Sequence, residues 1–372
     1  MQSIKKNRSL EDEHSAEKRG ANSTEEKHST EENHSTEKEH SIESENSMEK
    51  SRTAEEDSFC GKRSFHGNTQ VRTDLALEAR ESISEADSEL WGVRVEEYYH
   101  EEEDIRVTKV MIDTKNAARA MGKPVGIYVT MEAPAMVEPD EDYHREISAR
   151  LAEELKGLLP DAEKEQSVLV VGLGNREVTA DALGPQVVDN LFITRHIVKE
   201  YGKAAYNCDR MNQVSALEPG VMAKTGMETA EIVKGVVGET APDVLIVIDA
   251  LAARSTKRLN RTIQITNTGI QPGSGVGNHR NALTMESLGV PVIAIGIPTV
   301  VDAATIVGDA LDKLLEEDED PASARYREKQ KLNFAELNNM YMTGKDIDAV
   351  IKRVSYTVSE GINIAIGEAF ME

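Results

Sequence analysis

Val168-Leu-Val-Val-Gly-Leu-Gly-Asn175 and Val244-Leu-Ile-Val-Ile-Asp249 are two apolar runs, and each leads to an aspartate. The first reaches Asp181 through a short polar turn, and the second ends directly at Asp249. Short runs of Val, Ile and Leu bounded by polar turns are typical of strands buried on both faces. Ligands bind outside the carboxyl ends of such strands in open α/β sheets, so Asp181 and Asp249 form a candidate catalytic pair.

The surrounding sequence alternates predicted strands and helices. Apolar runs predict strands at Arg106–Ile112, Val125–Met131, Ser167–Leu173, Val244–Asp249, Leu259–Thr266 (with one wet face) and Val290–Ile297. Apolar periodicity predicts helices at Asp142–Leu159, Leu183–Val198 (with Val187, Val188, Leu191 and Phe192 inward), Thr225–Val237 (with a capping box of Thr225 and Glu228), Asp302–Leu315 and Lys345–Phe370. This alternation predicts an α/β fold with three layers, α/β/α, around a mostly parallel or mixed sheet.

Residues 1 to about 60 have a different composition from the rest of the chain. A six-residue repeat places serines at positions 23, 29, 35, 41 and 47, each followed two residues later by a glutamate. Almost no apolar residue is present to offset the entropy lost on ordering, so we expect a disordered N-terminal tail. His28, His34 and His40 leave metal binding by this tail open as an alternative.

Composition excludes several classes of protein. The net charge is -24, which argues against a nucleic-acid-binding surface. Cys60 and Cys208 are too few for a disulfide framework, and no apolar run follows the basic N-terminus as a secretory signal would require. Val290–Val301 is the longest apolar stretch and is too short to span a bilayer. We therefore expect a cytoplasmic protein without a direct nucleic-acid or membrane partner.

Familiar catalytic motifs are missing or incomplete. Gly172 and Gly174 resemble the start of a dinucleotide fingerprint, but Glu177 stands where the third glycine belongs and would repel a pyrophosphate. No H-E-x-x-H occurs, which excludes a thermolysin-type zinc site. Gly273-Ser-Gly-Val-Gly277 is close to a serine-hydrolase elbow but does not follow a predicted buried strand.

Paired carboxylates offer a chemistry that these exclusions leave open. Two neighbouring acids cannot both ionise cheaply, so one keeps a proton while the other activates water. Asp181 alone could instead cap the helix that follows it. His279 could join Asp181 and Asp249 in a metal site with two carboxylates and one histidine. Gly275 and Gly277, on the glycine-rich loop that precedes His279, are possible donors of backbone N–H groups to an oxyanion.

Several long motifs occur in an order that resembles one family of proteases. They are Val171-Gly-Leu-Gly-Asn-Arg-Glu-Val-Thr-Ala-Asp-Ala-Leu-Gly-Pro185, Gly226-Met-Glu-Thr229, Ile248-Asp-Ala-Leu-Ala-Ala-Arg254, Gly269-Ile-Gln-Pro-Gly-Ser-Gly-Val-Gly-Asn-His-Arg280 and Val290-Pro-Val-Ile-Ala-Ile-Gly-Ile-Pro-Thr-Val-Val-Asp-Ala303. From about Val71 to its C-terminus the chain resembles the germination protease (spore protease) family of endospore-forming bacteria. That family more often carries Trp-Asn at Arg176-Glu177 and Pro at Ala180, and its propeptide is usually shorter.

The resemblance implies a substrate and a processing site. Family members are homotetrameric zymogens that process themselves and degrade small acid-soluble spore proteins, which coat DNA in the dormant spore. They cleave after Glu or Asp within Thr-Glu-(Phe/Ile)-Ala-Ser-Glu-like sequences. Arg72-Thr-Asp-Leu-Ala-Leu-Glu78 is similar, so the expected self-cleavage bond is Asp74–Leu75. We thus expect a propeptide of residues 1–74 and a protease domain of residues 75–372, with 316–340 as a polar excursion or lid.

Two alternatives to the carboxylate-pair protease remain. The sequence also resembles hydrogenase-maturation endopeptidases, in which corresponding acids and a histidine line a metal site. That resemblance implies a metal-dependent endopeptidase using Asp181, Asp249 and His279. The second alternative is a non-catalytic binder of small ligands on the same fold. The leading hypothesis requires no cofactor, and it places the protein in the forespore or spore core.

Overall fold

The computed structural model describes residues 74–81, 91–161, 164–203, 211–273, 281–307, 310, 337 and 340–367. All of them belong to one unit of the chain, Arg63–Glu372. The predicted lid, 316–340, lies almost wholly outside the described residues, as does the predicted N-terminal tail.

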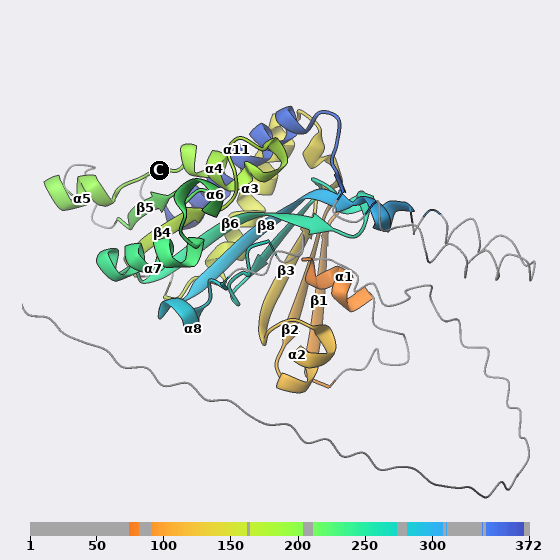
Figure 1. Ribbon diagram of the computed structural model, residues 1–372, viewed down its shortest axis with the longest axis horizontal. Helices are drawn as coiled ribbons and strands as arrows, with labels where there is room; N and C mark the ends of the chain where they lie inside the picture. The colour runs from red at the N-terminus through yellow and green to blue at the C-terminus, as the bar shows by residue number, and fades with distance from the viewer. Residues whose placement is uncertain are drawn as a thin grey trace, which may run out of the picture. The chain divides into compact units, whose positions relative to one another are not determined.

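The described strands form one mixed sheet, in the order β1-β2-β3-β7-β8-β6-β4-β5, with β9 paired to β8. β8, β6, β4 and β5 are parallel, whereas the neighbours from β1 through β7 to β8 are antiparallel. Figure 1 shows β1 to β3 descending at a steep angle from the parallel half. The strands are β1 Val93–His100, β2 Ile105–Ile112, β3 Gly126–Glu132, β4 Ser167–Gly172, β5 Gln213–Leu217, β6 Val244–Ala253, β7 Thr262–Thr266, β8 Val292–Asp302 and β9 Tyr341–Met342.

Helices cover both faces of the parallel half, which confirms the three-layer prediction (Figure 1). Because side chains alternate along a strand, Ile246 and Ile248 of β6 pack with α3, α4 and α11, whereas Leu245 and Val247 pack with α7 and α8. The helices are α1 Ala76–Glu81, α2 Lys115–Met121, α3 Glu141–Lys156, α4 Leu183–Asp189, α5 Arg195–Tyr201, α6 Met222–Thr225, α7 Thr229–Thr240, α8 Met285–Leu288 and α11 Ile347–Ile366, with short 3₁₀ turns η2 Pro134–Val137, η3 Thr179–Asp181 and η5 Thr256–Arg258.

Two predicted strand ends were wrong. β6 does not end at Asp249 but continues to Ala253, because Ala250 to Ala253 keep pairing with β8 across an irregularity after Leu251. β8 likewise runs on to Asp302, whose carboxylate accepts a hydrogen bond from the Thr305 backbone at 3.0 Å. Both central strands therefore extend beyond the level of the candidate acid.

Two predicted helices also differ from the structure. The expected helix Leu183–Val198 is divided into α4 and α5, and Phe192 in the break is 42% exposed rather than inward. The capping box before α7 uses Glu228 and Glu231, so Thr225 is not its N-cap. Thr225 instead belongs to the separate short helix α6, which ends at a left-handed Gly226.

The first part of the described chain explains why β7 has no wet face. All of its residues are buried, although alternation predicted one exposed side. Ile263 and Ile265 face the α3 and α11 core. The opposite face carries Gln264, which hydrogen bonds to the segment Asp74–Ala76. This segment of the chain thus replaces solvent over Gln264, in the middle of the polar face of β7.

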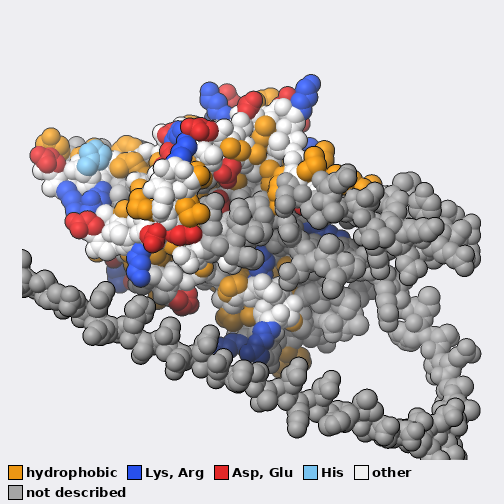
Figure 2. All heavy atoms as spheres, viewed as in Figure 1, with side chains coloured by type: hydrophobic (Ala, Val, Ile, Leu, Met, Phe, Trp, Pro, Cys, Tyr) orange, Lys and Arg blue, Asp and Glu red, His pale blue; other side chains and the backbone are white. Residues whose placement is uncertain are grey.

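The described surface carries charged side chains of both signs. Figure 2 shows basic and acidic side chains interspersed over the described part of one face. Some form exposed pairs, such as Arg94 with Asp113 and Lys224 with Glu177. Such pairs contribute about 0–1 kcal/mol each, so the core is the main source of stability. Within the described segments, no helix has the length and apolar character needed to cross a membrane.

Candidate active site

Glycines shape the loop that carries Asp181. A Cβ on Gly172 would lie 2.2 Å from the Gly184 carbonyl oxygen, so only glycine lets α4 pack this closely against the end of β4. Gly174 has φ +121°, and a Cβ there would lie 2.0 Å from the Asp181 carbonyl oxygen. The loop closes through the Asn175 N–H, which donates to the Asp181 carbonyl at 3.0 Å and to its carboxylate Oδ2 at 2.9 Å.

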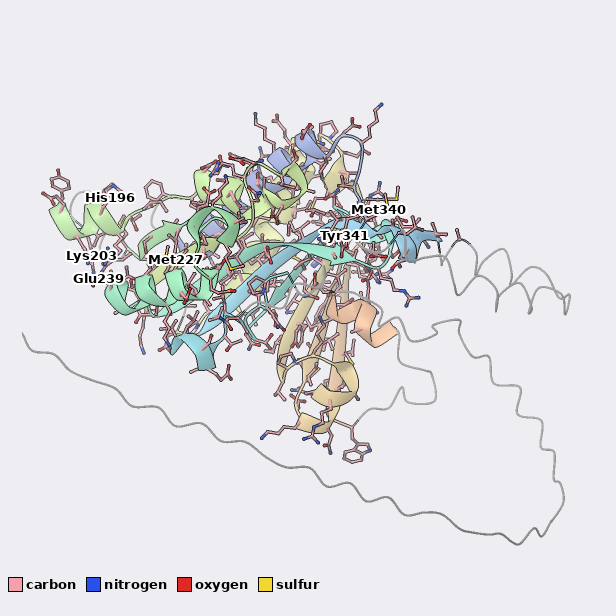
Figure 3. All side chains as sticks on the ribbon, in the orientation of Figure 1. His196, Lys203, Met227, Glu239, Met340 and Tyr341 are labelled. Carbon is pink, nitrogen blue, oxygen red and sulfur yellow. The ribbon has the colours of Figure 1, made fainter. Side chains whose placement is uncertain are left out.

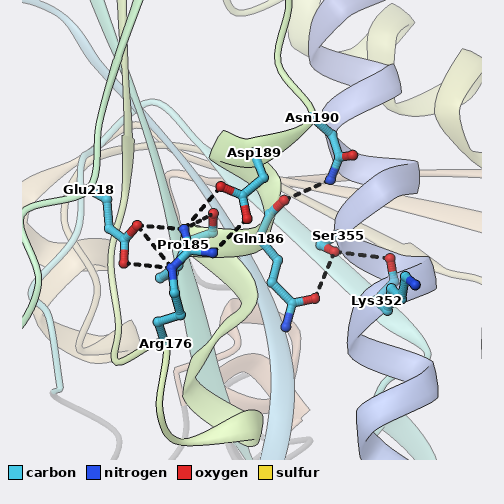
Figure 4. A network of polar contacts seen from close by, with 8 residues as sticks. All are labelled: Arg176, Pro185, Gln186, Asp189, Asn190, Glu218, Lys352 and Ser355. Atoms are coloured by element: carbon cyan, nitrogen blue, oxygen red, sulfur yellow. Dashed lines mark hydrogen bonds and ion pairs between the residues drawn. The ribbon is translucent and has the colours of Figure 1, made fainter.

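Arg176 ties the same loop to its surroundings (Figure 4). Its guanidinium pairs with Asp189 of α4 at 2.6 Å and with Glu218, just after β5, at 2.6 Å. It also donates to the Pro185 carbonyl oxygen at 3.1 Å. The hydrogen bonds that Arg176 donates to these two carboxylates raise the pKa of its guanidinium. The charged network fixes the loop that brings Asp181 to the end of β4.

The structure places this loop next to the strand that carries Asp249. The Leu173 N–H donates to the Ile248 carbonyl of β6 at 2.8 Å. The Thr299 hydroxyl of β8 donates to the Ala180 carbonyl at 2.6 Å, directly before Asp181. The turn η3 that ends at Asp181 thus contacts both β6 and β8. Sequence reasoning expected both acids at this edge of the sheet, and the structure brings their segments together there.

Asp249 lies inside the fold. Only 7% of it is exposed, and its Oδ1 accepts a hydrogen bond from the Ala250 N–H at 3.0 Å. It is paired in register with Gly296 of β8. A carboxylate buried to this degree requires polar partners or a proton, and this is the property expected of one member of an acid pair.

The residues proposed to assist the acids fall outside the described part. His279, Gly275 and Gly277 lie in the segment 274–280, which is not described. The histidines that are described lie elsewhere: His100 ends β1, His144 hydrogen bonds with Thr357 and the Glu138 carbonyl, and Figure 3 shows His196 on α5 at the far end of the sheet from Tyr341. Within the described residues, no group of three or more His, Cys, Asp and Glu side chains is placed to hold a metal ion.

The segment Asp74–Glu78 is docked along the extension of β6. The Asp74 N–H donates to the Ala252 carbonyl at 3.2 Å, and the Ala252 N–H donates to the Asp74 carboxylate at 3.0 Å. The Asp74 carbonyl oxygen accepts from Lys123 Nζ at 2.8 Å and from Gln264 Nε2 at 3.2 Å. Both the side chain and the main chain of Asp74 are therefore held.

The residues after Asp74 are buried. Leu75 is 0% exposed and packs with Leu251, Ala253 and Val301. Glu78 is 3% exposed, and its carboxylate accepts from the Arg254 N–H at 2.9 Å and the Ser255 N–H at 3.1 Å. Arg258 lies 3.4 Å from the same carboxylate. Figure 1 shows α1, which contains Glu78, beside the antiparallel strands.

Sequence reasoning did not identify Lys123, Gln264 or Arg258. Gln264 gave one usable signal, because it is a polar residue inside the buried run Thr262–Thr266. Lys123 gave none, since it follows a short helix in a polar segment. Burial lowers the pKa of the Lys123 ammonium, and the nearby charges of Asp74 and Glu78 oppose that shift.

A mixed α/β sheet that holds a peptide segment along the strand carrying a buried acid is an arrangement suited to an α/β peptidase. A sequence profile of germination protease matches residues 71–338. The chain therefore belongs to the germination protease family, whose members are endopeptidases.

Three relatives described as germination protease show the extent of the similarity. The protein from Caldanaerobacter subterraneus subsp. tengcongensis is 47% identical over 317 residues, which cover 81% of this chain and 96% of that one. The Clostridium perfringens protein is 45% identical over 312 residues, 80% of this chain and 95% of its own. The Bacillus cytotoxicus protein is 40% identical over 347 residues, 80% and 93% respectively.

A solved structure also resembles the chain weakly. It is a NiFe hydrogenase maturation protease from Thermococcus kodakarensis, with 14% identity and a TM-score of 0.28, covering 56% of this chain and 99% of that one. At that score the likeness has no bearing on the site.

Proposed function

We propose that this endopeptidase processes itself at the Asp74–Leu75 bond and then degrades small acid-soluble spore proteins at similar sequences. The observation that carries the proposal is the docking of Asp74–Glu78 along β6, on the strand that carries Asp249. A chain that binds its own segment in this way holds a specific peptide bond against the strand that carries the buried Asp249, at Ala252, three residues after the acid.

The contacts of the docked segment suit a Thr-(Glu/Asp)-(Phe/Ile/Leu)-Ala-x-Glu sequence. Asp74 precedes the bond, and its carboxylate accepts a hydrogen bond from a backbone N–H. Leu75 follows the bond and fills an apolar site. Ala76 is 0% exposed, which favours a small residue at that position. The Glu78 carboxylate accepts hydrogen bonds from two backbone N–H groups and forms an ion pair with Arg258. The same contacts would select an equivalent sequence in a substrate protein.

Asp181 and Asp249 supply the acid and base in this proposal. One carboxylate removes a proton from water, whose oxygen bonds to the Asp74 carbonyl carbon. The carbonyl π electrons move to the oxygen and return when the bond to the Leu75 nitrogen breaks. The other carboxyl delivers a proton to that nitrogen. The products are a new carboxyl group on Asp74 and a new amino group on Leu75, and water is the only co-reactant.

Replacing Asp249 by asparagine tests this assignment. The full-length Asp249→Asn chain should give no new N-terminus at Leu75 by mass spectrometry, because the asparagine amide can neither accept the proton of the attacking water nor donate one to the Leu75 nitrogen. Asp243→Asn is the matched control, since Asp243 is exposed and precedes the other end of β6. Self-cleavage of Asp249→Asn at the wild-type rate would refute the carboxylate-pair mechanism. Loss of wild-type cleavage after exhaustive chelation would instead favour a metal-dependent reaction.

A further inference from the structure

We propose that Lys123 and Gln264 bind and stabilise the oxyanion that forms on Asp74 during self-cleavage. This inference rests on the proposed function, because it assumes that Asp74–Leu75 is the bond that breaks. It adds two residues to the reaction that neither the sequence motifs nor the candidate acids indicated.

Two hydrogen-bond donors converge on the Asp74 carbonyl oxygen. Lys123 Nζ lies 2.8 Å and Gln264 Nε2 lies 3.2 Å from the Asp74 carbonyl oxygen. The two donors come from segments that are far apart in the sequence. Lys123 follows the C-terminal cap of α2, and Gln264 lies in the middle of β7. Two preorganised donors on a carbonyl oxygen are the arrangement that stabilises negative charge in acyl transfer.

Gln264 also holds the peptide on both sides of Leu75. Its Oε1 accepts from the Ala76 N–H at 2.6 Å, while its Nε2 donates to the Asp74 carbonyl. One side chain therefore fixes the orientation of the peptide unit that contains the Asp74–Leu75 bond. Gln264 is 8% exposed, so little water competes for these contacts.

The register of the sheet places Gln264 and Asp249 at the same level. Gly296 of β8 is the partner of Gln264 on one side and of Asp249 on the other. Paired residues of adjacent strands point to the same face, so Gln264 and Asp249 lie at one level and face the same side. Their Cα atoms are two strand spacings apart, roughly 10 Å. The side chain of Leu251 packs over Gly296 between them and also packs with Leu75, so the segment that Gln264 holds lies on the face of the sheet that carries Asp249.

The position of Lys123 is fixed by its neighbours. Helix α2 ends at Gly122 with φ 63°, a left-handed cap that turns the chain before Lys123. The Tyr128 hydroxyl donates to the Pro124 carbonyl at 2.9 Å and anchors the next residue. The Lys123 ammonium therefore reaches Asp74 from a restrained backbone. The negative charges that act on this ammonium are those of Asp74 and Glu78.

In the reaction, these donors act on the oxygen and take no covalent part. As the water oxygen bonds to the Asp74 carbon, negative charge develops on the carbonyl oxygen, and the hydrogen bonds from Lys123 and Gln264 strengthen. When the carbonyl re-forms and the Leu75 nitrogen leaves with its proton, both donors are unchanged. Removal of one oxyanion donor lowers rates by about 100- to 1,000-fold in other proteases.

The test measures self-cleavage of the full-length chain, followed by mass spectrometry as the appearance of the Leu75 N-terminus. Lys123→Met and Gln264→Met should each lower the first-order rate constant by about 100-fold or more. Lys123→Arg should restore part of the rate, since arginine keeps a charged donor. Lys115→Met is the matched control, because Lys115 is exposed at the start of the same helix. Melting temperatures identify any variant that loses rate through unfolding.

The pH profile separates a charged donor from a purely structural role. In the wild type the rate should fall at alkaline pH as Lys123 loses its proton, whereas Lys123→Arg should keep its rate there. If the wild type cleaves itself and the rate constant of Lys123→Met is within threefold of the wild-type value, this inference is overturned and the proposed function stays intact. Identical alkaline limbs in the wild type and Lys123→Arg would also overturn it. A wild-type chain that never cleaves would overturn the proposed function itself.

Discussion

Replacing Glu78 by glutamine should slow self-cleavage by about two orders of magnitude. Glu78 is 3% exposed and accepts two backbone hydrogen bonds, at 2.9 and 3.1 Å, with Arg258 at 3.4 Å. A glutamine keeps one acceptor but presents an NH2 group to the second N–H, so one charge-assisted bond is lost and a donor faces a donor. Hydrogen bonds to charged groups contribute about 1.5–3 kcal/mol. A loss of about 3 kcal/mol in docking corresponds to a roughly 100-fold lower rate.

The assay is the rate at which the Leu75 N-terminus appears in the full-length chain. Glu239→Gln is the matched control, because Glu239 is exposed on α7 at the other end of the sheet from Tyr341 (Figure 3). Glu78→Asp should lower the rate less than Glu78→Gln does, because aspartate keeps the negative charge, although its side chain is shorter. A Glu78→Gln rate equal to that of the wild type would show that the docked contacts of Glu78 do not guide cleavage, and the reasoning would fail.

Two further predictions concern the framework of the site. Gly174→Ala should abolish self-cleavage and lower the melting temperature, because the new Cβ would lie 2.0 Å from the Asp181 carbonyl oxygen at a φ of +121°; an active, equally stable variant would contradict this. Burial raises the pKa of Tyr128 to about 12, above its unfolded value near 10, so the unfolded state loses its proton first and stability should fall between pH 10 and 12. Two pKa units correspond to about 2–3 kcal/mol once the pH exceeds both pKa values, and about half of this, roughly 1.3 kcal/mol, should be lost between pH 9 and pH 11. Urea unfolding at those two pH values should show this difference in the wild type but not in Tyr128→Phe.

The layers of the fold could be predicted because they depend on side-chain patterns. The apolar runs at Ser167–Leu173 and Val244–Asp249 correspond to β4 and the first part of β6, and the periodicity of Asp142–Leu159 corresponds to α3. β1 and β5 were not predicted. β1 is mostly exposed and β5 is short and only partly buried, so neither carries a strong apolar signal.

Strand ends were the weakest part of the prediction for a physical reason. The run at Asp249 was expected to end there because an acid usually marks the edge of a core. β6 continues because backbone pairing with β8 is independent of the side chain, and the Leu251 side chain of this extension packs over Gly296, where a Cβ would lie 2.4 Å from Leu251 Cδ1. A pattern of side chains cannot report hydrogen bonds that the main chain supplies.

The same limit explains why the sequence located the candidate acids but not the contacts of the docked segment. The carboxylates of Asp74 and Glu78 accept hydrogen bonds from the backbone N–H groups of Ala252, Arg254 and Ser255. Almost any residue type can supply a backbone N–H group, so the sequence does not mark these donors. All three follow Asp249 in the chain, on the extension of β6 or just beyond it. The extension of β6 therefore links the candidate acid with the docked peptide: it begins directly after Asp249, and its far end, with the residues just beyond it, bears the N–H groups that hold Asp74 and Glu78. A substitution that shortens β6 should consequently weaken docking even where every site side chain is retained.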